Sequence, residues 1–290
     1  MRLASVWRDE AEHPALIDQD RGVIELAALA EHASPALRAV TSVMDLLGDD
    51  ALLAEAETLL ATAPEARFVP ADSVTFGAPY RRPRKIWGIG LNYRDHAADL
   101  SEQAPDQPAS FIKGDHTIVG QREQIVVPRQ SQRTTVEAEL GLVIGRTCRD
   151  VDVDSALDYV WGVTTVLDQT AEDILRLNPR YLTRSKNFPS FFCFGPQLVP
   201  LREVLEGVDA LEDLQVTTVV NDTDTRTNSV ANMTHRPASL VSFHSQMMPL
   251  YPGDIISTGT PGAIVVGEGD RVECRIPGVG TLRTTVTVQR

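Results

Sequence analysis

The stretch TTVEAELGLVIGR, residues 134–146, carries the pattern from which the fold is predicted. Successive side chains of a β-strand point to opposite faces, so the apolar residues at every second position from 136 to 144 share one face. Glu137 and Glu139 then stand side by side on the other face, which we expect to line a solvated cleft. Two carboxylates this close are unfavourable in poorly solvated surroundings unless a cation lies between them. The stretch therefore predicts a strand that carries either two solvated charges or half of a metal site.

The composition limits the classes of protein to consider. A chain of 290 residues, 42% of them hydrophobic, is expected to form one large domain, with or without a small appendage. The net charge of −13 argues against broad contact with nucleic acid or an acidic membrane surface. No apolar run approaches the length of a membrane span, and the N-terminus MRLASVWRDEAEHP turns acidic before a signal sequence could develop. We therefore expect a cytoplasmic protein.

The three cysteines, Cys148, Cys193 and Cys274, are far apart and odd in number. This spacing predicts neither a disulfide framework nor a zinc site. We expect buried, reduced thiols.

The chain is predicted to have two parts. Residues 2–7 and 14–26, with the turn DQDRG, have the pattern of a small hairpin, and the leucines and alanines of 46–66 have helical spacing. The stretch FGAPYRRPRK, with two prolines, is typical of a linker. We therefore place a small α/β domain at 1–75 and a larger domain at 80–290.

The larger part is predicted to be mostly strands. Strand patterns occur at 85–91, 124–128, 136–145, 160–168, 214–222, 254–259 and 271–288, and helical patterns at 152–160, 170–177 and 237–247. Strands without regular intervening helices argue against a doubly wound parallel sheet. The expected fold class is α+β, predominantly β.

A third carboxylate, Asp168, ends the nearly continuous apolar run of 160–168, as at the tip of a buried strand that opens into a cleft. Together with Glu137 and Glu139 it would offer three oxygen ligands, which suit Mg²⁺, Mn²⁺ or Ca²⁺ better than zinc. The alternative is that Asp168 is the N-cap of a following helix.

Two further groups of residues could take part in chemistry. If a helix begins at YRDHAADL, His96 and Asp99 lie on one face, and a carboxylate beside an imidazole is the arrangement of a general base; a surface histidine beside an acid is the alternative. Lys113 and Lys186 would balance the charge of three carboxylates around a dication and bind an anionic substrate, unless both only extend along the surface. The glycine-bounded turn GDIISTGTPG presents Thr258 and Thr260 to an oxyanion, or is a simple bend.

Taken together, these segments resemble the fumarylacetoacetate hydrolase family. The resemblance covers 80–290 and consists of seven ordered blocks: GIGLNYRDHAAD, FIKGDHTIVG, VEAELGLVIGR, YVWGVTTVLDQTAED, RSKNFPSFFCFGP, VVNDTDTRTNSVANM and YPGDIISTGTPG. The small N-terminal segment is similar to the appendage of many bacterial members. The resemblance implies a mixed β-roll and a homodimer.

The resemblance also assigns roles to individual residues. It places Glu137, Glu139 and Asp168 at the metal-ligand positions, His96 at the catalytic histidine with Asp99 as its partner, and Lys186 at a catalytic, substrate-binding lysine. Tyr93, Lys113 and Thr260 correspond to substrate-binding positions. The implied cofactor is Mg²⁺ or Mn²⁺, with Ca²⁺ as the third candidate, and the implied partner is a small anionic keto acid.

Some positions depart from the pattern of this family. Glu172 replaces an arginine and Leu175 a glutamine that many members have near the substrate, so a cation is lost and an anion gained. Arg176, Arg180 and Arg184 are close enough in sequence to substitute. His235 and Arg236 stand where apolar residues are common. The question is whether one of these cations enters the pocket beside Lys186.

The expected function is hydrolysis of a carbon–carbon bond in a β-diketo acid of the acylpyruvate or fumarylpyruvate type, through a metal-stabilised enolate. Three alternatives remain open. The first is decarboxylation or keto–enol isomerisation of oxaloacetate or a ring-cleavage product, and the second is turnover of a 2-keto-3-deoxy sugar acid. The third is a binding protein that has lost its chemistry.

Overall fold

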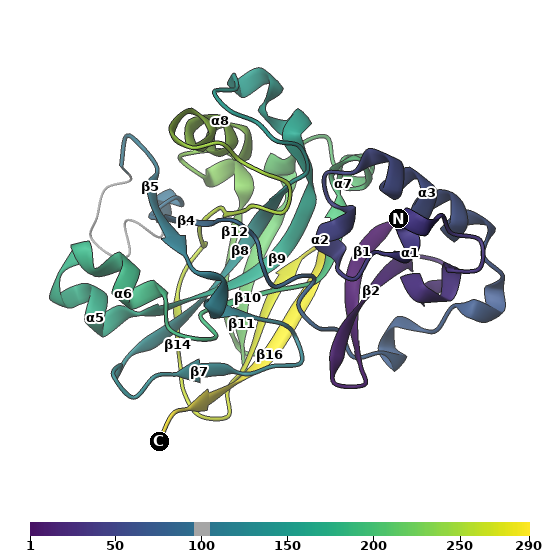
Figure 1. The fold of residues 1–290 in the computed structure, drawn as a ribbon. Coiled ribbons are helices and arrows are strands. Elements are labelled where there is room, and N and C mark those ends of the chain that lie inside the picture. Colours follow the sequence, from purple (N-terminus) through teal and green to yellow (C-terminus); the bar gives the residue numbers. More distant parts are fainter. Residues whose placement is uncertain (96–104) are drawn as a thin grey trace.

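The computed structural model describes residues 1–95 and 105–290. Its described strands form two sheets (Figure 1). The larger has the order β3-β2-β1-β10-β9-β8-β13-β4-β5, with β14 pairing to β8 and β6 to β10; the smaller has the order β12-β11-β15-β16-β7. With short helices between the strands, the architecture is α+β and predominantly β, as predicted.

The centre of the larger sheet is the antiparallel pair β8 (Thr134–Ile144) and β9 (Val160–Ala171). Every residue of β8 is buried, so the expected alternation of a core face and a solvated face is wrong for this strand. The larger sheet also contains β10 (Phe192–Pro200), β13 (Ile255–Ser257), β4 (Ile86–Gly90), β5 (Ala109–Lys113), β6 (Ile118–Val119) and β14 (Ile264–Val266), of which β13 and β14 pair directly with β8. A strand covered on both faces explains its near-continuous apolar sequence.

The smaller sheet packs against the β8–β9 pair and encloses the main core. It contains β7 (Ile125–Val127), β11 (Gln215–Val220), β12 (Asp224–Ser229), β15 (Arg271–Ile276) and β16 (Gly280–Val288). Residues of β11, β15 and β16 contact β8 and β9. One hydrophobic cluster joins both sheets and includes Leu140, Leu167, Val216, Cys274 and Leu282. The three cysteines are buried and unpaired, as expected.

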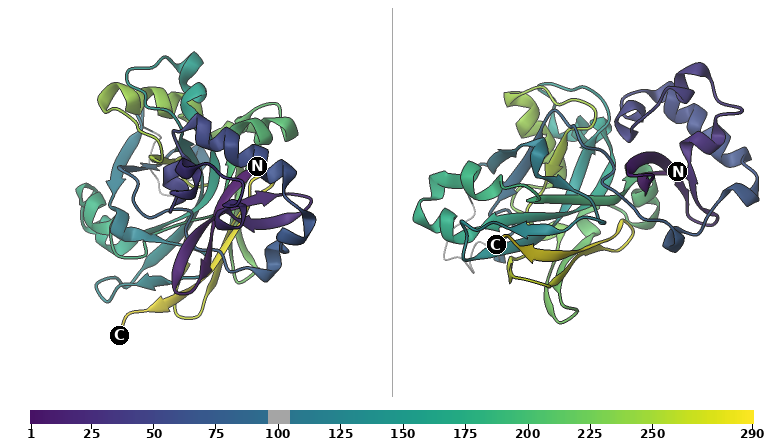
Figure 2. Two further views of the ribbon diagram at one scale, coloured as in Figure 1. Left: turned by 45° about the vertical axis from the view of Figure 1, so that its right-hand side comes forward. Right: turned by 60° about the horizontal axis from the view of Figure 1, so that its bottom comes forward.

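The N-terminal segment extends the larger sheet. Instead of a hairpin it forms a three-stranded meander of β1 (Arg2–Arg8), β2 (Ala11–Asp18) and β3 (Gly22–Glu25), and β1 pairs with β10. Helices α1 (Pro35–Arg38), α2 (Val43–Leu46) and α3 (Asp50–Thr62) cover it, to the right in Figure 1 and in the right-hand view of Figure 2. Leu3 and Leu46 share a core cluster with Phe192 and Ile255 of the larger part. The boundary at 75–80 therefore remains a prediction.

The remaining helices only partly follow the predicted pattern. Helix α8 (Pro237–Met247) coincides with its predicted range, and α5 (Glu172–Leu177) begins two residues late. The stretch 153–159 is the 3₁₀ helix η5 and not an α-helix. Short helices α6 (Leu182–Lys186) and α7 (Leu201–Gly207) were not predicted. Among the described residues, no helix is long and apolar enough to cross a bilayer.

Candidate metal centre

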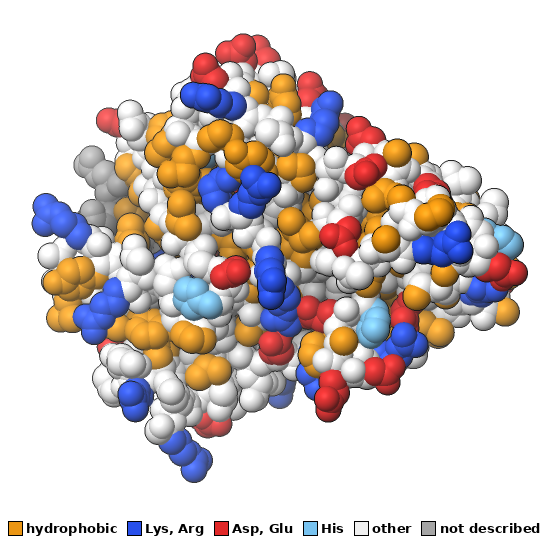
Figure 3. Space-filling view, viewed as in Figure 1, with side chains coloured by type: hydrophobic (Ala, Val, Ile, Leu, Met, Phe, Trp, Pro, Cys, Tyr) orange, Lys and Arg blue, Asp and Glu red, His pale blue; other side chains and the backbone are white. Residues whose placement is uncertain are grey.

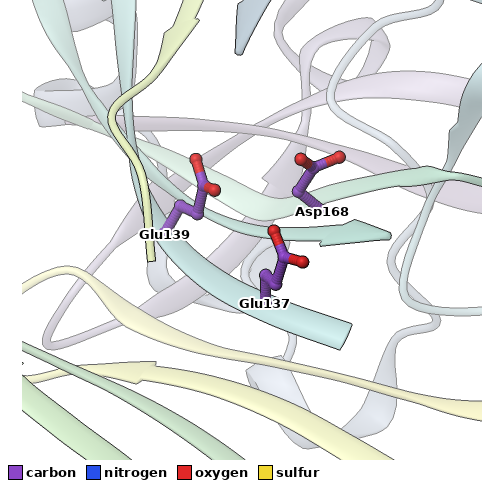
Figure 4. A group of neighbouring side chains, drawn as sticks. All are labelled: Glu137, Glu139 and Asp168. Atoms are coloured by element: carbon purple, nitrogen blue, oxygen red, sulfur yellow. The ribbon is translucent and has the colours of Figure 1, made fainter. Parts of the chain in front are cut away.

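Three carboxylates meet on one side of the β8–β9 ladder. Glu137 lies directly opposite Asp168 in the antiparallel register, and Glu139 follows on the same face of β8. One oxygen from each of the three side chains lies within 4.8 Å of the other two. Figure 4 shows the carboxylates projecting to the same side from the two strands. The structure thus brings together the three carboxylates that the sequence predicted as metal ligands.

The surroundings of these carboxylates differ from the prediction. Glu137, Glu139 and Asp168 are 8%, 1% and 1% exposed, so they do not line an open, solvated cleft. Asp168 is not at a strand tip, because β9 continues to Ala171. Nor is it an N-cap: Ala171 occupies that position of α5 and makes no side-chain capping bond. Both alternatives that treated these acids as ordinary surface or capping groups are wrong.

Two buried ammonium groups balance much of the negative charge. Lys186 Nζ donates to Glu137 Oε2 at 2.8 Å and to Asp168 Oδ2 at 2.6 Å. Lys113 Nζ donates to Asp168 Oδ1 at 2.6 Å and to the carbonyl oxygen of Lys186. Burial opposes the charge of Lys186, but Asp168 and Glu137 outweigh it and raise its pKa. For Lys113, burial outweighs Asp168 and lowers the pKa. Both lysine side chains are buried, so the alternative that they extend along the surface is wrong.

Glu139 is held by the turn that follows β13. Its Oε2 accepts hydrogen bonds from Ser257 Oγ at 2.6 Å and from the Gly259 amide at 2.8 Å. Gly259 has φ +99°, and an added Cβ would lie 2.8 Å from Asn92 Cβ, so only glycine fits. Burial, followed by the charge of Asp168, raises the pKa of Glu139 to about 8. This carboxyl group is short of positive charge despite the two lysines.

Glu137 is held by two threonines of the same ladder. Thr170 Oγ1 donates to Glu137 Oε1 at 2.6 Å, and Thr135 Oγ1 donates to the same oxygen at 3.1 Å. Thr135 and Thr170 are themselves paired in the strand register. These threonines and Ser257 were not among the site residues predicted from the sequence. The T-x-E and D-x-T spacings, which place the hydroxyls on the carboxylate face, could have identified Thr135 and Thr170.

The residues present fit a hard divalent cation. All three ligands are oxygens, which Mg²⁺, Mn²⁺ and Ca²⁺ prefer. With all three carboxylates ionised, as metal binding requires, and two ammonium groups, the buried site carries a formal charge of −1, and a cation would lower the raised pKa of Glu139.

The other predicted site residues that the structure describes, Tyr93 and Thr260, are both buried. Tyr93 is fully buried, its hydroxyl has no hydrogen-bond partner among the described residues, and burial together with Glu139 raises its pKa. Thr260 is buried, and its hydroxyl pairs with Gly262 within the turn. His96 and Asp99 lie outside the described residues. Asn92, which was not predicted, donates to the carbonyl oxygens of Thr258 and His235 and so ties two loops together.

Glu172 lies four residues beyond Asp168 and forms ion pairs with two arginine side chains. It accepts hydrogen bonds from Arg133 Nε and, at 2.7 Å, from an Arg176 terminal nitrogen. Arg133 was not among the arginines proposed to replace the lost cation.

His235 Nε2 lies 2.9 Å from the Pro105 carbonyl oxygen, so this ring contacts the chain next to the undescribed segment and not Lys186. Figure 3 shows basic and acidic side chains interspersed over one face of the molecule.

Comparison with known proteins gives the family. The model of the fumarylacetoacetate (FAA) hydrolase C-terminal domain matches residues 85–287. That range includes all three carboxylates, both lysines and the turn that holds Glu139.

Three relatives indicate the range of activities. A 2,4-didehydro-3-deoxy-L-rhamnonate hydrolase from a Sphingomonas strain is 32% identical over 100% of this chain and 97% of its own. The human mitochondrial oxaloacetate tautomerase FAHD2A is 32% identical over 77% of this chain and 72% of its own. The crystal structure of maleylpyruvate hydrolase from Sphingobium sp. SYK-6, in complex with manganese(II) and pyruvate, covers both chains completely, with a TM-score of 0.80 and 26% identity.

Proposed function

We propose, from the premise that this chain belongs to the fumarylacetoacetate hydrolase family, that it is a divalent-metal-dependent hydrolase of 2,4-diketo acids. It would cleave the carbon–carbon bond of an acylpyruvate-type substrate and release pyruvate and a second carboxylic acid. The observation that carries the proposal is the buried cluster of Glu137, Glu139 and Asp168 with the Lys186 ammonium between two of them.

The names of two relatives support this substrate class. The Sphingomonas relative, which aligns over the whole chain, acts on a 2,4-didehydro-3-deoxy acid, a name that denotes oxo groups at C2 and C4. The solved maleylpyruvate hydrolase carries manganese and pyruvate, which is the product expected here.

The chemistry divides between the cation and the side chains. A bound Mg²⁺ or Mn²⁺, held by Glu137, Glu139 and Asp168, would supply Lewis-acid polarisation and offset enolate charge. His96, with Asp99 as its proposed partner, is proposed to accept a proton from water as the hydroxyl adds to the distal carbonyl. The bond between this carbon and pyruvate C3 then breaks, and its electron pair becomes an enolate. Lys186 donates a hydrogen bond to the developing oxyanion, and the proton from water returns to C3. Tyr93, Lys113 and Thr260 are proposed to hold the substrate.

The test is a panel of 2,4-diketo acids, oxaloacetate and 2-keto-3-deoxy sugar acids, offered to the metal-loaded protein. We expect loss of the enol absorbance of at least one 2,4-diketo acid, and no such loss for Glu139→Gln. Thr164→Val is the matched control, because the Thr164 hydroxyl bonds the Gln197 carbonyl oxygen away from the cluster. Turnover confined to oxaloacetate would refute hydrolysis.

A second candidate, oxaloacetate tautomerisation or decarboxylation, is favoured by the human relative. It needs the enolate site but no attacking water. His96→Ala separates the two activities: it should abolish hydrolysis, whereas retention of the oxaloacetate reaction alone would support the second candidate. The homodimer also remains a proposal, which light scattering after size exclusion would test.

A further inference from the structure

Each glutamate of the metal cluster has one oxygen fixed by two protein donors. Ser257 Oγ and the Gly259 amide bond Glu139 Oε2, at 2.6 and 2.8 Å. Thr170 Oγ1 and Thr135 Oγ1 bond Glu137 Oε1, at 2.6 and 3.1 Å. In each glutamate, both of these donors bond the same carboxylate oxygen. Fixing one oxygen sets the direction of the other, and for Glu137 that other oxygen, Oε2, also accepts a hydrogen bond from Lys186 Nζ at 2.8 Å.

The donors stand on rigid parts of the fold. Thr135 and Thr170 face each other across β8 and β9, and Ser257 ends β13 opposite Gly141 of β8. All three are buried, at 2%, 3% and 1% exposed. Because strands at the centre of a sheet cannot follow a rotating side chain, a glutamate that turned to offer both oxygens to a cation would break its two hydrogen bonds.

This restriction affects cations unequally. Ca²⁺ takes six to eight oxygen ligands at roughly 2.3–2.6 Å and commonly binds a carboxylate through both oxygens. Mg²⁺ demands octahedral geometry at about 2.0–2.1 Å and uses single oxygens with water or substrate in the other positions. Mn²⁺ shares the octahedral oxygen geometry. Glutamates limited to one oxygen each therefore suit the smaller ions.

We propose that Ser257 and Thr170 are positioning residues that set the metal preference, by holding Glu139 and Glu137 to one-oxygen coordination and so selecting Mn²⁺ or Mg²⁺ against Ca²⁺. The inference goes beyond the proposed function, because it holds whichever keto acid is turned over. Its readout is metal binding without substrate, so it can fail independently of the proposed hydrolysis.

The experiment is calorimetric titration of the metal-stripped full-length protein with Mn²⁺ and, separately, with Ca²⁺. The variants are Ser257→Ala, Thr170→Val and the two combined. Loss of groups that orient metal ligands typically weakens binding by about 10- to 100-fold. We expect the Mn²⁺ affinity of Ser257→Ala to fall by about tenfold or more, and the Ca²⁺ affinity to fall less, so that the Mn²⁺/Ca²⁺ preference shrinks further in the double variant.

Matched controls separate positioning from general damage. Thr170→Ser keeps the hydroxyl and should keep the native preference, whereas Thr170→Val should lose part of it. Thr164→Val, on the same strand but bonded to Gln197, should change neither affinity. An equal loss for both ions, or an unchanged ratio in the double variant, would overturn the proposal. If the double variant fails to fold, the Thr170→Ser and Thr170→Val pair decides the question.

Discussion

Metal binding should release a proton from Glu139, and the raised pKa of this group determines how many protons are released per metal ion at a given pH. Burial and the charge of Asp168 raise the pKa of this carboxyl group to about 8 in the metal-free protein. At pH 7 it is then protonated in about nine molecules of ten. A carboxylate must be deprotonated to bind a cation, so Mn²⁺ has to displace that proton. We expect release of about 0.9 proton per Mn²⁺ at pH 7 and about 0.1 at pH 9.

The affinity should follow the same titration. It should rise by about ninefold from pH 6 to pH 7 and about fivefold from pH 7 to pH 8, and level off above, because each pH unit well below the pKa costs about 1.4 kcal/mol. Stability of the metal-free protein should change in the opposite direction. The folded pKa of Glu139 is raised above the model value of 4.5, so the folded state binds more protons and stability falls as pH rises from about 4.5 to 8.

The assay is calorimetry at pH 7 in buffers of different ionisation enthalpy, which gives the number of protons released. Glu139→Gln is the control, since its amide has no proton to release; weaker Mn²⁺ binding without proton release is expected. Proton release near zero in the native protein, with equal affinity at pH 6 and pH 8, would refute the assignment of Glu139 as a protonated ligand.

Three substitutions test other parts of the structure. Lys186→Met should lower kcat by about 10²- to 10³-fold, because it removes an oxyanion donor, while Mn²⁺ affinity by calorimetry does not fall; unchanged kcat would contradict the role. Lys85→Met should reduce the free energy of unfolding in urea by about 3 kcal/mol, since Lys85 Nζ bonds the fully buried Asp254 at 2.6 Å. Leu140→Ala should cost about 2–5 kcal/mol in the same assay, because Leu140 is fully buried between the two sheets; a loss below about 1 kcal/mol would place it outside the core.

The cluster of three carboxylates could be predicted because it depends on strand periodicity. The alternation in residues 134–146 put Glu137 and Glu139 on one face, the apolar run of 160–168 that ends in Asp168 added the third carboxylate, and the resemblance assigned all three to a metal. What the sequence could not provide was register. The apolar pattern suggested that the strand ends at Asp168. In the observed register Thr135 pairs with Thr170 and Thr134 with Ala171, so β9 continues three residues beyond Asp168.

Burial and long-range contacts were the other missing information. The carboxylates lie on the face of β8 and β9 opposite the one that packs against the second sheet, and Lys113 of β5, Lys186 of α6 and the turn after β13 cover them, so the expected open cleft is a buried cluster. Ser257 is 118 residues from Glu139 in the chain, and Arg133 is 39 from Glu172. No local pattern encodes such pairs. The helical pattern of 152–160 formed a 3₁₀ helix, which short segments adopt readily.

The most direct test of the central claim is pyruvate release from a 2,4-diketo acid, coupled to lactate dehydrogenase, with Mn²⁺ present and after removal of the metal by a chelator. We expect one pyruvate per substrate consumed, dependent on Mn²⁺ and absent in Asp168→Asn. Disappearance of the enol without pyruvate, or equal pyruvate release after chelation, would contradict it.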